Sequence, residues 1–516
     1  MRTDRILRYV AAFCPTCHGE DPDRPLAEVE RLSGYLSEAD GRVWLVRGCS
    51  RHGRIETLYD EHADILGYLE QWTAPTKVHT PDTIGNYDPV PSSYLRGLGE
   101  MQTQHTCILL EDVIQTCNLR CPTCFAGSSP DLTGVVPVDE VLANVDQRLE
   151  RENGRIDVLM LSGGEPTIHP QFLELLKQVI RRNIVRVLIN TNGIQIARSD
   201  DLLQFLAAHN DRIEVYLQFD GFKLSTHRYH RAADLRRIKQ QAVERLSEHG
   251  IFTTLTMTAA LGVNDDEIGS VVLFALDTPF VGGVCIQPQF GSGRSTPLDP
   301  MSRLTHTGVL ARLDPQTEGV VTWRDLTALP CSHPHCCSVG YMLYTDRGQW
   351  KSLVSVIGHE ELKARLDLIS NRIADWQVSD NIRSLIKDSL LGLLSEQTSL
   401  THPTTTDLFR NICENCDLGM ATLLRLATDS LRGRRKRIRE FLARRVKRIT
   451  VKPFMDIHTM LEERLLQCCV HVGTRDDLQH QCAPFCAVQA WSRLGQSKLG
   501  ERAGAGGRAL DLVRRN

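Results

Sequence analysis

The chain has 516 residues, of which 41% are hydrophobic and 24% charged, a composition typical of a soluble protein with two to four domains. No apolar run reaches the roughly 18 residues that span a membrane, and the N-terminus shows no signal peptide, so we expect a cytoplasmic protein. The net charge of −3 argues against nucleic acid as a partner.

Seventeen cysteines stand out in this composition, because a reducing compartment does not maintain structural disulfides and clustered cysteines then indicate metal sites. Together with changes in hydrophobic periodicity, they divide the chain into five regions. In chain order these are a rubredoxin-like metal-binding domain (1–72), a linker rich in Pro and Thr (73–104), a core of strand–helix units (105–310), a cysteine-bearing C-terminal domain (311–490) and a basic disordered tail (491–516).

The N-terminal region carries a candidate site for a single metal ion. Cys14 and Cys17 form a C-x2-C pair, and Cys49 follows in the segment GCSRHG. Paired thiolates at this spacing suit a tetrahedral iron or zinc ion. The spacing leaves the fourth ligand open between Cys107 and His52, and a buried apolar thiol is the alternative role of Cys107.

The core region repeats a strand followed by a helix. Units of this kind imply an α/β fold with a parallel sheet, whose working edge lies at the carboxyl ends of the strands. Motifs rich in Gly, Asn, Gln and Asp follow the strands at that edge. The expected strand segments are 107–114, 155–166, 185–193, 213–221, 251–262 and 282–294, with helices over 172–182, 201–209 and 236–250 and a separate short strand at 42–47.

The strongest motif follows the first of these core strands. Cys117, Cys121 and Cys124 form a C-x3-C-x2-C loop. Three thiolates on one loop can bind three irons of a [4Fe–4S] cluster and leave the fourth iron open to a small molecule. Structural zinc, the alternative, usually takes four ligands in two pairs, and the motif does not contain that pattern.

The segment CNLRCPTCF resembles the signature of radical S-adenosylmethionine (SAM) enzymes, and the resemblance extends over the six strand–helix units. It implies a partial (β/α)6 barrel in which SAM chelates the open iron through its amino and carboxylate groups. Electron transfer, from a donor such as ferredoxin or flavodoxin, then releases a 5′-deoxyadenosyl radical. The resemblance also implies that the loops at the strand ends bind SAM. The residues at the matching positions are Gly163, Gly164, Glu165, Pro166, Asn190, Asn192, Gln218 and Asp220.

Motifs outside the core narrow the resemblance. CPTC, QHTC, PCSHPHCC, CCVH and PFC together resemble the radical SAM subgroup of archaeal tetraether lipid synthase and of relatives proposed to methylate methanopterin, over about residues 10–490. This resemblance implies a mononuclear iron or zinc site, with Cys107 favoured as its fourth ligand, and two auxiliary [4Fe–4S] clusters. The chain departs from the subgroup pattern at QHQCAPFCAVQ, where Cys482 is inserted.

Two auxiliary clusters would draw on eight cysteines of the C-terminal region. Their pairing cannot be deduced from sequence, and adjacent cysteines commonly split between sites for steric reasons. Cys285 and Cys482 are left without a role. The eight candidates are Cys331, Cys336, Cys337, Cys413, Cys416, Cys468, Cys469 and Cys486.

A basic segment bears on the choice of substrate. Residues 432–448 hold ten basic side chains and one acid, and apolar residues from Ile438 to Ile449 recur at helical spacing. Such a helix can lie on anionic lipid headgroups, which would give peripheral membrane contact through 431–449. The alternative is a surface helix whose apolar stripe packs inward.

We therefore expect a radical SAM enzyme that acts on an unactivated C–H bond, with coupling of membrane-lipid alkyl chains as the first candidate reaction. Methylation of a pterin or another small molecule is the alternative. The remote alternative is a non-catalytic iron–sulfur electron-transfer protein, which would need neither an open iron nor a SAM pocket.

Overall fold

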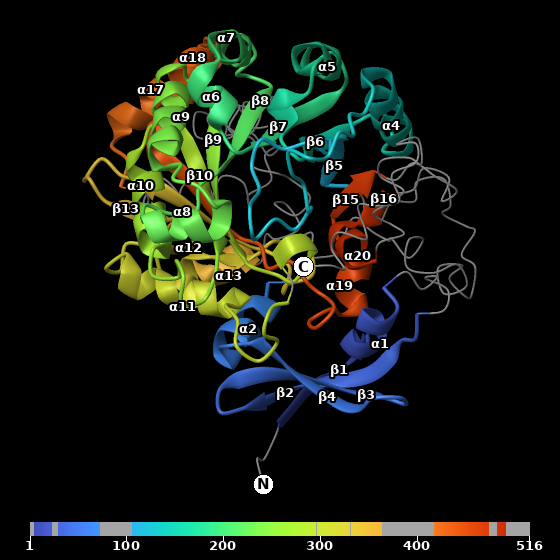
Figure 1. Ribbon diagram of the computed structural model, residues 1–516. Helices are drawn as coiled ribbons and strands as arrows, with labels where there is room; N and C mark the ends of the chain where they lie inside the picture. The colour runs from blue at the N-terminus through green and yellow to red at the C-terminus, as the bar shows by residue number, and fades with distance from the viewer. Residues whose placement is uncertain are drawn as a thin grey trace.

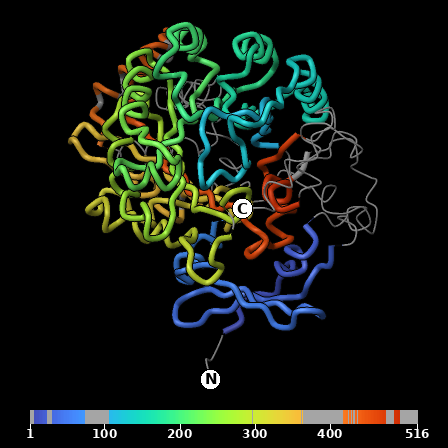
Figure 2. The backbone as a smooth tube through the Cα atoms, viewed as in Figure 1, coloured from blue at the N-terminus to red at the C-terminus, as the bar shows by residue number. Residues whose placement is uncertain are grey.

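The computed structural model describes residues 5–22, 29–72, 106–295, 297–330, 332–363, 417–473 and 482–491. Within them the strands form two sheets, a four-stranded sheet in the N-terminal region and a twelve-stranded sheet in the rest of the chain (Figure 1). The smaller sheet lies beyond one end of the larger one, and the C-terminal helices α19 (Glu462–Leu466) and α20 (Phe485–Ala490) lie between them (Figure 2).

The N-terminal sheet is antiparallel, in the order β1-β2-β3-β4. One of its faces packs on the rest of the molecule, because Val43 and Leu45 of β3 are buried together with Leu461, which pairs with Ala12 in an isolated bridge. The expected strand at 42–47 lies within β3. The elements of this region are β1 (Arg5–Ala12), α1 (Pro15–Glu20), β2 (Leu32–Ala39), β3 (Arg42–Cys49), β4 (Gly53–Asp60) and α2 (Ala63–Glu70).

The larger sheet contains six consecutive parallel strands, β5 to β10, separated by helices, which confirms the expected α/β barrel. The strands are β5 (Ile108–Ile114), β6 (Ile156–Gly163), β7 (Ile184–Thr191), β8 (Ile213–Gln218), β9 (Thr253–Ala259) and β10 (Val281–Pro288). The helices between them are α4 (Val138–Arg151), α5 (Phe172–Val179), α6 (Ile194–Arg198), α7 (Asp200–Ala208), α8 (Leu224–Arg231), α9 (Arg236–Glu248) and α10 (Ile268–Asp277), with the short turn η3 (Pro166–Ile168).

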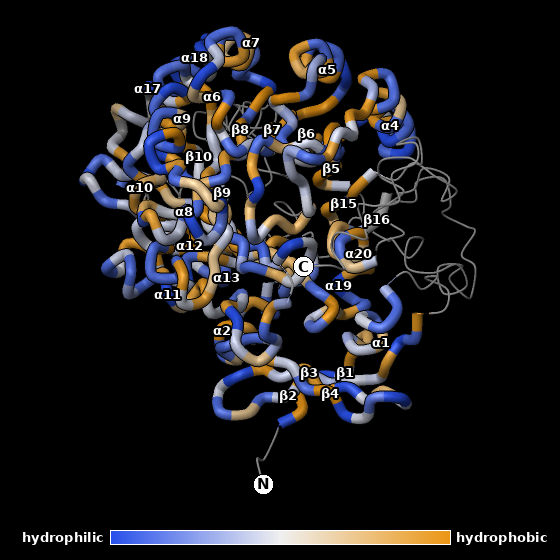
Figure 3. The backbone as a smooth tube through the Cα atoms, viewed as in Figure 1, coloured by the Kyte–Doolittle hydropathy of each residue, from blue (hydrophilic) through white to orange (hydrophobic). Residues whose placement is uncertain are grey.

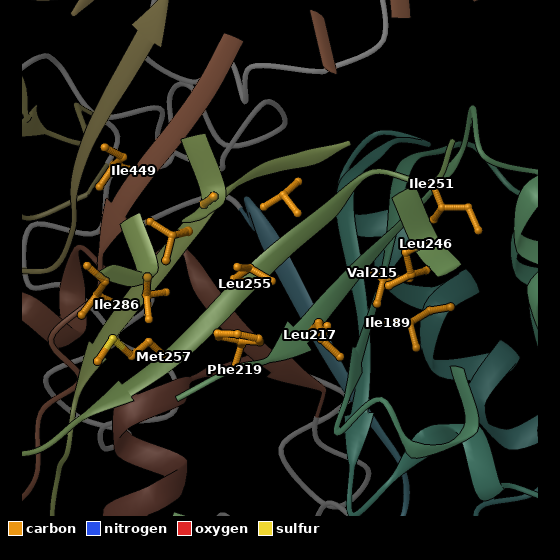
Figure 4. Close-up of a cluster of buried hydrophobic side chains, with 14 of the residues drawn as sticks. Ile189, Val215, Leu217, Phe219, Leu246, Ile251, Leu255, Met257, Ile286 and Ile449 are labelled. Carbon is orange, nitrogen blue, oxygen red and sulfur yellow. The ribbon is translucent and has the colours of Figure 1, made fainter. Parts of the chain in front are cut away.

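The parallel strands are apolar on both faces, as strands buried on both sides require. One face carries Ile189, Val215, Leu217 and Leu255, which belong to the same buried cluster as Leu246 of α9 (Figure 4). The covering helices are amphipathic, and hydrophobic and hydrophilic residues alternate along α4 and α5 (Figure 3). Because side chains alternate along a strand, the other residues of β5 to β10 point into the barrel.

Strands of the C-terminal region extend the core sheet at both edges. β14 (Val446–Val451) pairs in parallel with β10 and antiparallel with β12, while β15 pairs in parallel with β5. The described parts of residues 311–490 therefore contribute strands to the same sheet as the barrel. Their further strands are β11 (Thr327–Ala328), β12 (Ser338–Tyr344), β13 (Trp350–Ser352), β15 (Val470–Gly473) and β16 (Cys482–Pro484). The remaining elements are η4 (Gly293–Ser295), α11 (His306–Gln316), η5 (Trp323–Asp325), α12 (Leu353–Ile357), α13 (His359–Lys363), α17 (Met420–Leu431) and α18 (Arg435–Arg445).

The sequence predicts a helix over the whole basic segment, and this prediction is wrong beyond Arg445. Helix α18 ends there and the chain continues as β14, whose β-branched residues favour a strand. Lys447 is buried and donates from Nζ to the carbonyl oxygens of Thr278 (2.6 Å) and Val281 (2.7 Å). Ile438 is buried as well, so the apolar stripe packs inward. In the described ranges, every helix is too short or too polar to cross a bilayer.

Candidate active site and metal centre

The cysteine loop follows the carboxyl end of β5 and is held by one arginine from a distant loop. Arg294 donates from Nε to the carbonyl oxygen of Cys121 (2.9 Å), from Nη1 to that of Gly127 (2.7 Å) and from Nη2 to that of Ser128 (2.6 Å). These carbonyls belong to one short segment, so a single guanidinium links both ends of the loop.

The three cysteines of this loop fit an iron–sulfur cluster better than a single ion. Among the described residues, the one group of three or more Cys, His or acidic ligands within 4.8 Å of one another lies in the N-terminal region. Burial raises the pKa of the Cys117 thiol to about 12, so at neutral pH it needs a metal to become a thiolate. Cys117, Cys121 and Cys124 therefore would hold a cluster wider than one ion, with three ligands and one open iron.

Gly163 and Gly164 bring the loop after β6 against the end of β5. A Cβ on Gly163 would lie 2.2 Å from the carbonyl oxygen of Ile114, and one on Gly164 would lie 2.1 Å from that of Thr116. The same two carbonyls accept from the backbone N–H groups of Gly164 (2.6 Å) and Glu165 (3.0 Å). Both positions therefore require glycine, because the two backbones touch where the chain enters the cysteine loop.

The buried carboxylate of Glu165 accepts hydrogen bonds from residues at the end of β7. Its Oε1 accepts from the hydroxyl of Thr191 (2.6 Å), and its Oε2 accepts from the backbone N–H of Asn192 (2.7 Å). Asn192 donates from Nδ2 to Oδ1 of Asn118 in the cysteine loop (2.7 Å). Burial raises the pKa of Glu165 and these donors oppose that effect. Glu165 thus fixes Asn192, while Pro166 begins the turn that follows.

The other predicted SAM residues form a hydrogen-bonded row across the strand ends. Asn190 accepts at Oδ1 from Nε2 of Gln218 (2.9 Å), and Gln218 accepts at Oε1 from Nη2 of Arg231 (3.0 Å). Arg231 also binds both carboxylate oxygens of Asp220, from Nε (2.6 Å) and Nη2 (2.7 Å). Its Nη1 faces Sγ of Cys121 at 3.9 Å. The structure therefore brings these residues together and connects them to the cysteine loop.

Sequence patterns do not single out Arg231 or Arg294, although both organise the site. Arg231 is the last residue of α8, and Arg294 lies in the loop after β10. The one feature of the sequence that they share is that each arginine lies in the segment after a core strand, Arg231 after β8 and Arg294 after β10. Because Asp220 is ion-paired with Arg231, we interpret Asp220 as a positioning group and Arg231 as the residue that faces the cysteine loop.

The N-terminal metal centre is a compact set of four ligands. Nδ1 of His52 lies 3.4 Å from Sγ of Cys14, 3.3 Å from Sγ of Cys17 and 3.6 Å from Sγ of Cys49. Three sulfurs and one imidazole nitrogen around a common point suit a tetrahedral ion. Nε2 of His52 contacts Oε1 of Glu20 (3.1 Å), which directs Nδ1 toward the sulfurs.

The prediction that Cys107 is the fourth ligand is wrong, because His52 takes that place. Cys107 precedes β5 and packs against Cys469 at the edge of the large sheet. The β3–β4 hairpin turn carries both Cys49 and His52, so a local turn supplies two ligands at once. The pairing of β5 with β15 carries Cys107 away from them.

Replacing His52 by alanine is expected to weaken metal binding at this centre, because one of four ligands is removed. The matched variant Cys107→Ala is expected to retain the metal. Elemental analysis of the anaerobically purified protein, before and after dialysis against a chelator, measures both. Loss of the mononuclear metal from Cys107→Ala and its retention in His52→Ala would contradict this ligand set.

Three cysteines from separate segments gather in the C-terminal region. Burial raises the pKa of Cys468 well above its usual range and that of Cys486 to about 12, and Cys336 adds to the shift in both. Arg464 is buried beside them and donates from Nε to Sγ of Cys336 (3.3 Å). Buried thiols beside a guanidinium suit an anionic iron–sulfur cluster.

The adjacent cysteines 468 and 469 contact different partners. Cys469 packs against Cys107, whereas Cys486 and Cys336 raise the pKa of Cys468. Cys285 is buried inside the barrel in the same cluster as Tyr216. Of the other predicted ligands, Cys337 is buried just before β12, whereas Cys331, Cys413 and Cys416 lie outside the described residues, as does the side chain of Cys482.

Comparison with known proteins identifies two domains in the chain. A family model described as the radical SAM superfamily matches residues 113–275, and one described as the HMPTM N-terminal zinc ribbon domain matches residues 6–61.

The chain is 24% identical over 509 residues to 7,8-dihydro-6-hydroxymethylpterin dimethyltransferase of Methanocaldococcus jannaschii, covering 93% of each protein. It is 27% identical over 150 residues to the antilisterial bacteriocin subtilosin biosynthesis protein AlbA of Bacillus subtilis, covering 28% of this chain and 32% of that protein. Among solved structures, a radical SAM methyltransferase from Sphaerobacter thermophilus matches with a TM-score of 0.32 and 14% identity, covering 59% of this chain and 79% of that one.

Proposed function

This chain is a radical SAM enzyme with an N-terminal zinc ribbon, and we propose that it methylates a carbon atom of a pterin. One observation carries the proposal. The similarity to a protein named as a pterin dimethyltransferase covers 93% of both chains, so it includes the N-terminal and C-terminal regions as well as the barrel. The similarity to AlbA, in contrast, covers 28% of this chain.

The residues around the cysteine loop fit radical chemistry. Cys117, Cys121 and Cys124 would hold a [4Fe–4S] cluster, which together with SAM supplies a 5′-deoxyadenosyl radical that removes a hydrogen atom from a C–H bond. Arg231 places a positive charge beside the sulfur of Cys121 and so offsets the negative charge of thiolate ligands. Arg294 keeps the loop carbonyls in place, which limits reorganisation at the site.

Part of the barrel interior next to this loop is apolar, and aromatic rings border it. The ring of Phe125, in the cysteine loop, lies 5.8 Å from that of Phe290 and 5.6 Å from that of Phe485, between ring centroids. Phe454 and Phe485 are 4.5 Å apart. Aromatic rings beside the cysteine loop offer few hydrogen atoms that a carbon radical could abstract. The same buried cluster includes Leu110, Val158, Met160, Leu188 and Tyr216.

We further propose that the C-terminal region holds the auxiliary clusters. Cys336, Cys468 and Cys486 are the supporting group, because they come from three segments and the buried guanidinium of Arg464 acts on Cys336 and Cys486. Iron content above that of one cluster, in protein whose three central cysteines are replaced by alanine, would support this assignment.

Methylation is tested with purified protein reconstituted anaerobically with iron and sulfide, given 7,8-dihydro-6-hydroxymethylpterin, a chemical reductant and SAM. One SAM supplies the radical, and a second supplies the methyl group and leaves as S-adenosylhomocysteine. We expect 5′-deoxyadenosine, together with a pterin whose mass rises by one or two methyl groups. Deuterium at the reacting carbon should appear in 5′-deoxyadenosine if that carbon loses the hydrogen atom directly. Formation of 5′-deoxyadenosine with an unchanged pterin, while lipid or another added substrate is modified, would contradict the proposal.

Coupling of lipid alkyl chains is the second candidate, because a hydrocarbon chain needs apolar surroundings and a buried apolar cluster lies beside the cysteine loop. Anaerobic expression in a host of defined lipid composition tests it. A new lipid with the mass of two chains joined and two hydrogens lost, absent from an empty-vector control, would favour coupling over methylation.

A further inference from the structure

Cys107 and Cys469 lie side by side near one edge of the large sheet. They immediately precede β5 and β15, which pair in parallel. The carbonyl oxygen of Cys469 accepts from the backbone N–H groups of Cys107 (3.0 Å) and Ile108 (3.1 Å). Both cysteine side chains are buried and pack against each other. Two sulfur atoms, one from the start of the barrel and one from the C-terminal region, therefore occupy the same place.

A third cysteine reaches this place from the opposite edge of the sheet. The backbone N–H of Leu329 donates to the carbonyl oxygen of Cys337 (2.8 Å), which continues the antiparallel pairing of β11 with β12. Residues opposite each other in such a pair carry their side chains on one face, with Cβ atoms about 5 Å apart. The side chain of Leu329 packs against Cys107 and Cys469. The buried side chain of Cys337 therefore lies on the face that meets this pair.

The three cysteines suit a cluster better than a single ion. Among the described residues, the one group whose ligand atoms all lie within 4.8 Å of one another is the N-terminal metal centre. Ile108 and Val470 pack around the pair of Cys107 and Cys469. Thiolates buried in apolar surroundings need cations beside them, and the irons of a cluster supply that charge. Plain packing of three apolar thiols is the alternative.

The neighbours of these cysteines in the sequence face a different group. Sγ of Cys336 lies 3.3 Å from Nε of Arg464, the guanidinium of the auxiliary group proposed above. Successive side chains of an extended segment point to opposite sides. Cys336 and Cys337 can therefore serve two separate clusters, and so can Cys468 and Cys469.

We propose that Cys107, Cys337 and Cys469 hold a second auxiliary iron–sulfur cluster, which joins the two edges of the large sheet. The inference rests on the proposed function, because auxiliary clusters are part of that function. β5 spans seven residues, about 23 Å, and separates this site from the cysteine loop. A cluster here contributes by holding β15 and the β11–β12 hairpin together at the barrel, since metal binding supplies folding energy.

The content of iron and acid-labile sulfide in the full-length, anaerobically reconstituted protein tests this site without any turnover. Cys107→Ala is expected to lose about four irons and four sulfides per chain, the content of one cube. Cys469→Ala should lose the same amount, and the double variant no more than either, because both cysteines bind one cluster. Combining Cys107→Ala with Cys336→Ala should double the loss, because Cys336 belongs to the other auxiliary group.

Cys285→Ala is the matched control. Cys285 is also buried, but it lies in the barrel interior with Tyr216, so its replacement should leave the iron and sulfide content unchanged. The mononuclear centre contains no sulfide, and loss of sulfide therefore separates a cluster from a role of Cys107 at that centre. Full iron and sulfide in Cys107→Ala, or loss of one metal ion without sulfide, would overturn the inference.

A serine variant covers the case in which Cys107→Ala does not fold, as judged by circular dichroism. Cys107→Ser keeps the size of the side chain and offers an oxygen ligand, so the electron paramagnetic resonance spectrum of the reduced protein should change. An unchanged spectrum would reject the site. Loss of cluster iron from Cys107→Ala in a protein that leaves pterins unchanged would keep the site and reject the proposed function, whereas pterin methylation by a Cys107→Ala protein of full iron content would do the reverse.

Discussion

Replacing Cys121 by alanine is expected to abolish the formation of 5′-deoxyadenosine. The sulfur of Cys121 is one of only three protein ligands that the central loop offers to a cluster, and it is the one that Arg231 faces at 3.9 Å. With two ligands left, the loop cannot hold a [4Fe–4S] cube with a single open iron, so SAM has no iron to chelate. Liquid chromatography with mass detection of reductant-driven SAM cleavage measures the effect.

The N-terminal metal centre is an internal control for this variant. Cys14, Cys17, Cys49 and His52 form a ligand set that includes no residue of the central loop, so the Cys121→Ala protein should retain its mononuclear metal while losing cluster iron. Retention of that metal shows that the N-terminal region has folded, and circular dichroism that matches the wild type shows the same for the barrel. SAM cleavage that persists in a folded Cys121→Ala protein would mean that the catalytic cluster lies elsewhere.

Breaking the ion pair between Asp220 and Arg231 is expected to destabilise the protein by about 3–5 kcal/mol, because removal of one partner leaves an uncompensated buried charge. Asp220 is fully buried and Arg231 retains 12% side-chain exposure. Asp220→Asn and Arg231→Gln should each cost this amount, while the double variant should cost less than the sum. Anaerobic chemical denaturation measures the change in the free energy of unfolding.

The pair Asp234–Arg236 is the matched control, since it joins the same residue types near the start of α9 but leaves 47% and 45% of the two side chains exposed. Asp234→Asn should change stability little, because exposed pairs are screened by water. Equal effects of Asp220→Asn and Asp234→Asn would show that the buried pair does not hold the site together.

The buried pair Asp220–Arg231 also makes the stability of the protein depend on pH. Burial alone would raise the pKa of Asp220, but Arg231 lowers it well below its usual range. A carboxyl group whose pKa is lower in the folded state stabilises that state above its unfolded pKa of about 3.9. This contribution is lost as the pH falls below that value, and it should be missing in Asp220→Asn.

The amino-acid sequence by itself determines the barrel and the order of its strands. Strand-length apolar segments alternate with amphipathic helices, and short right-handed connections place successive parallel strands side by side. The carboxyl ends of the strands then share one edge, so Glu165, Asn190 and Gln218 were expected near the cysteine loop from their positions in the chain. Local motifs such as C-x3-C-x2-C carry their chemistry in their spacing, which needs no tertiary information.

Only the tertiary structure decided which distant segments meet. His52 rather than Cys107 completes the N-terminal ligand set, because the β3–β4 turn brings it to the sulfurs while β5 pairs with β15. Residues beyond Arg445 join the sheet as β14, since the open edge of β10 offers hydrogen-bond partners that a helix would leave unused. Arg231 gains its importance from burial and from the charges around it. Those properties depend on packing between segments, and the spacing of residues along a chain does not contain them.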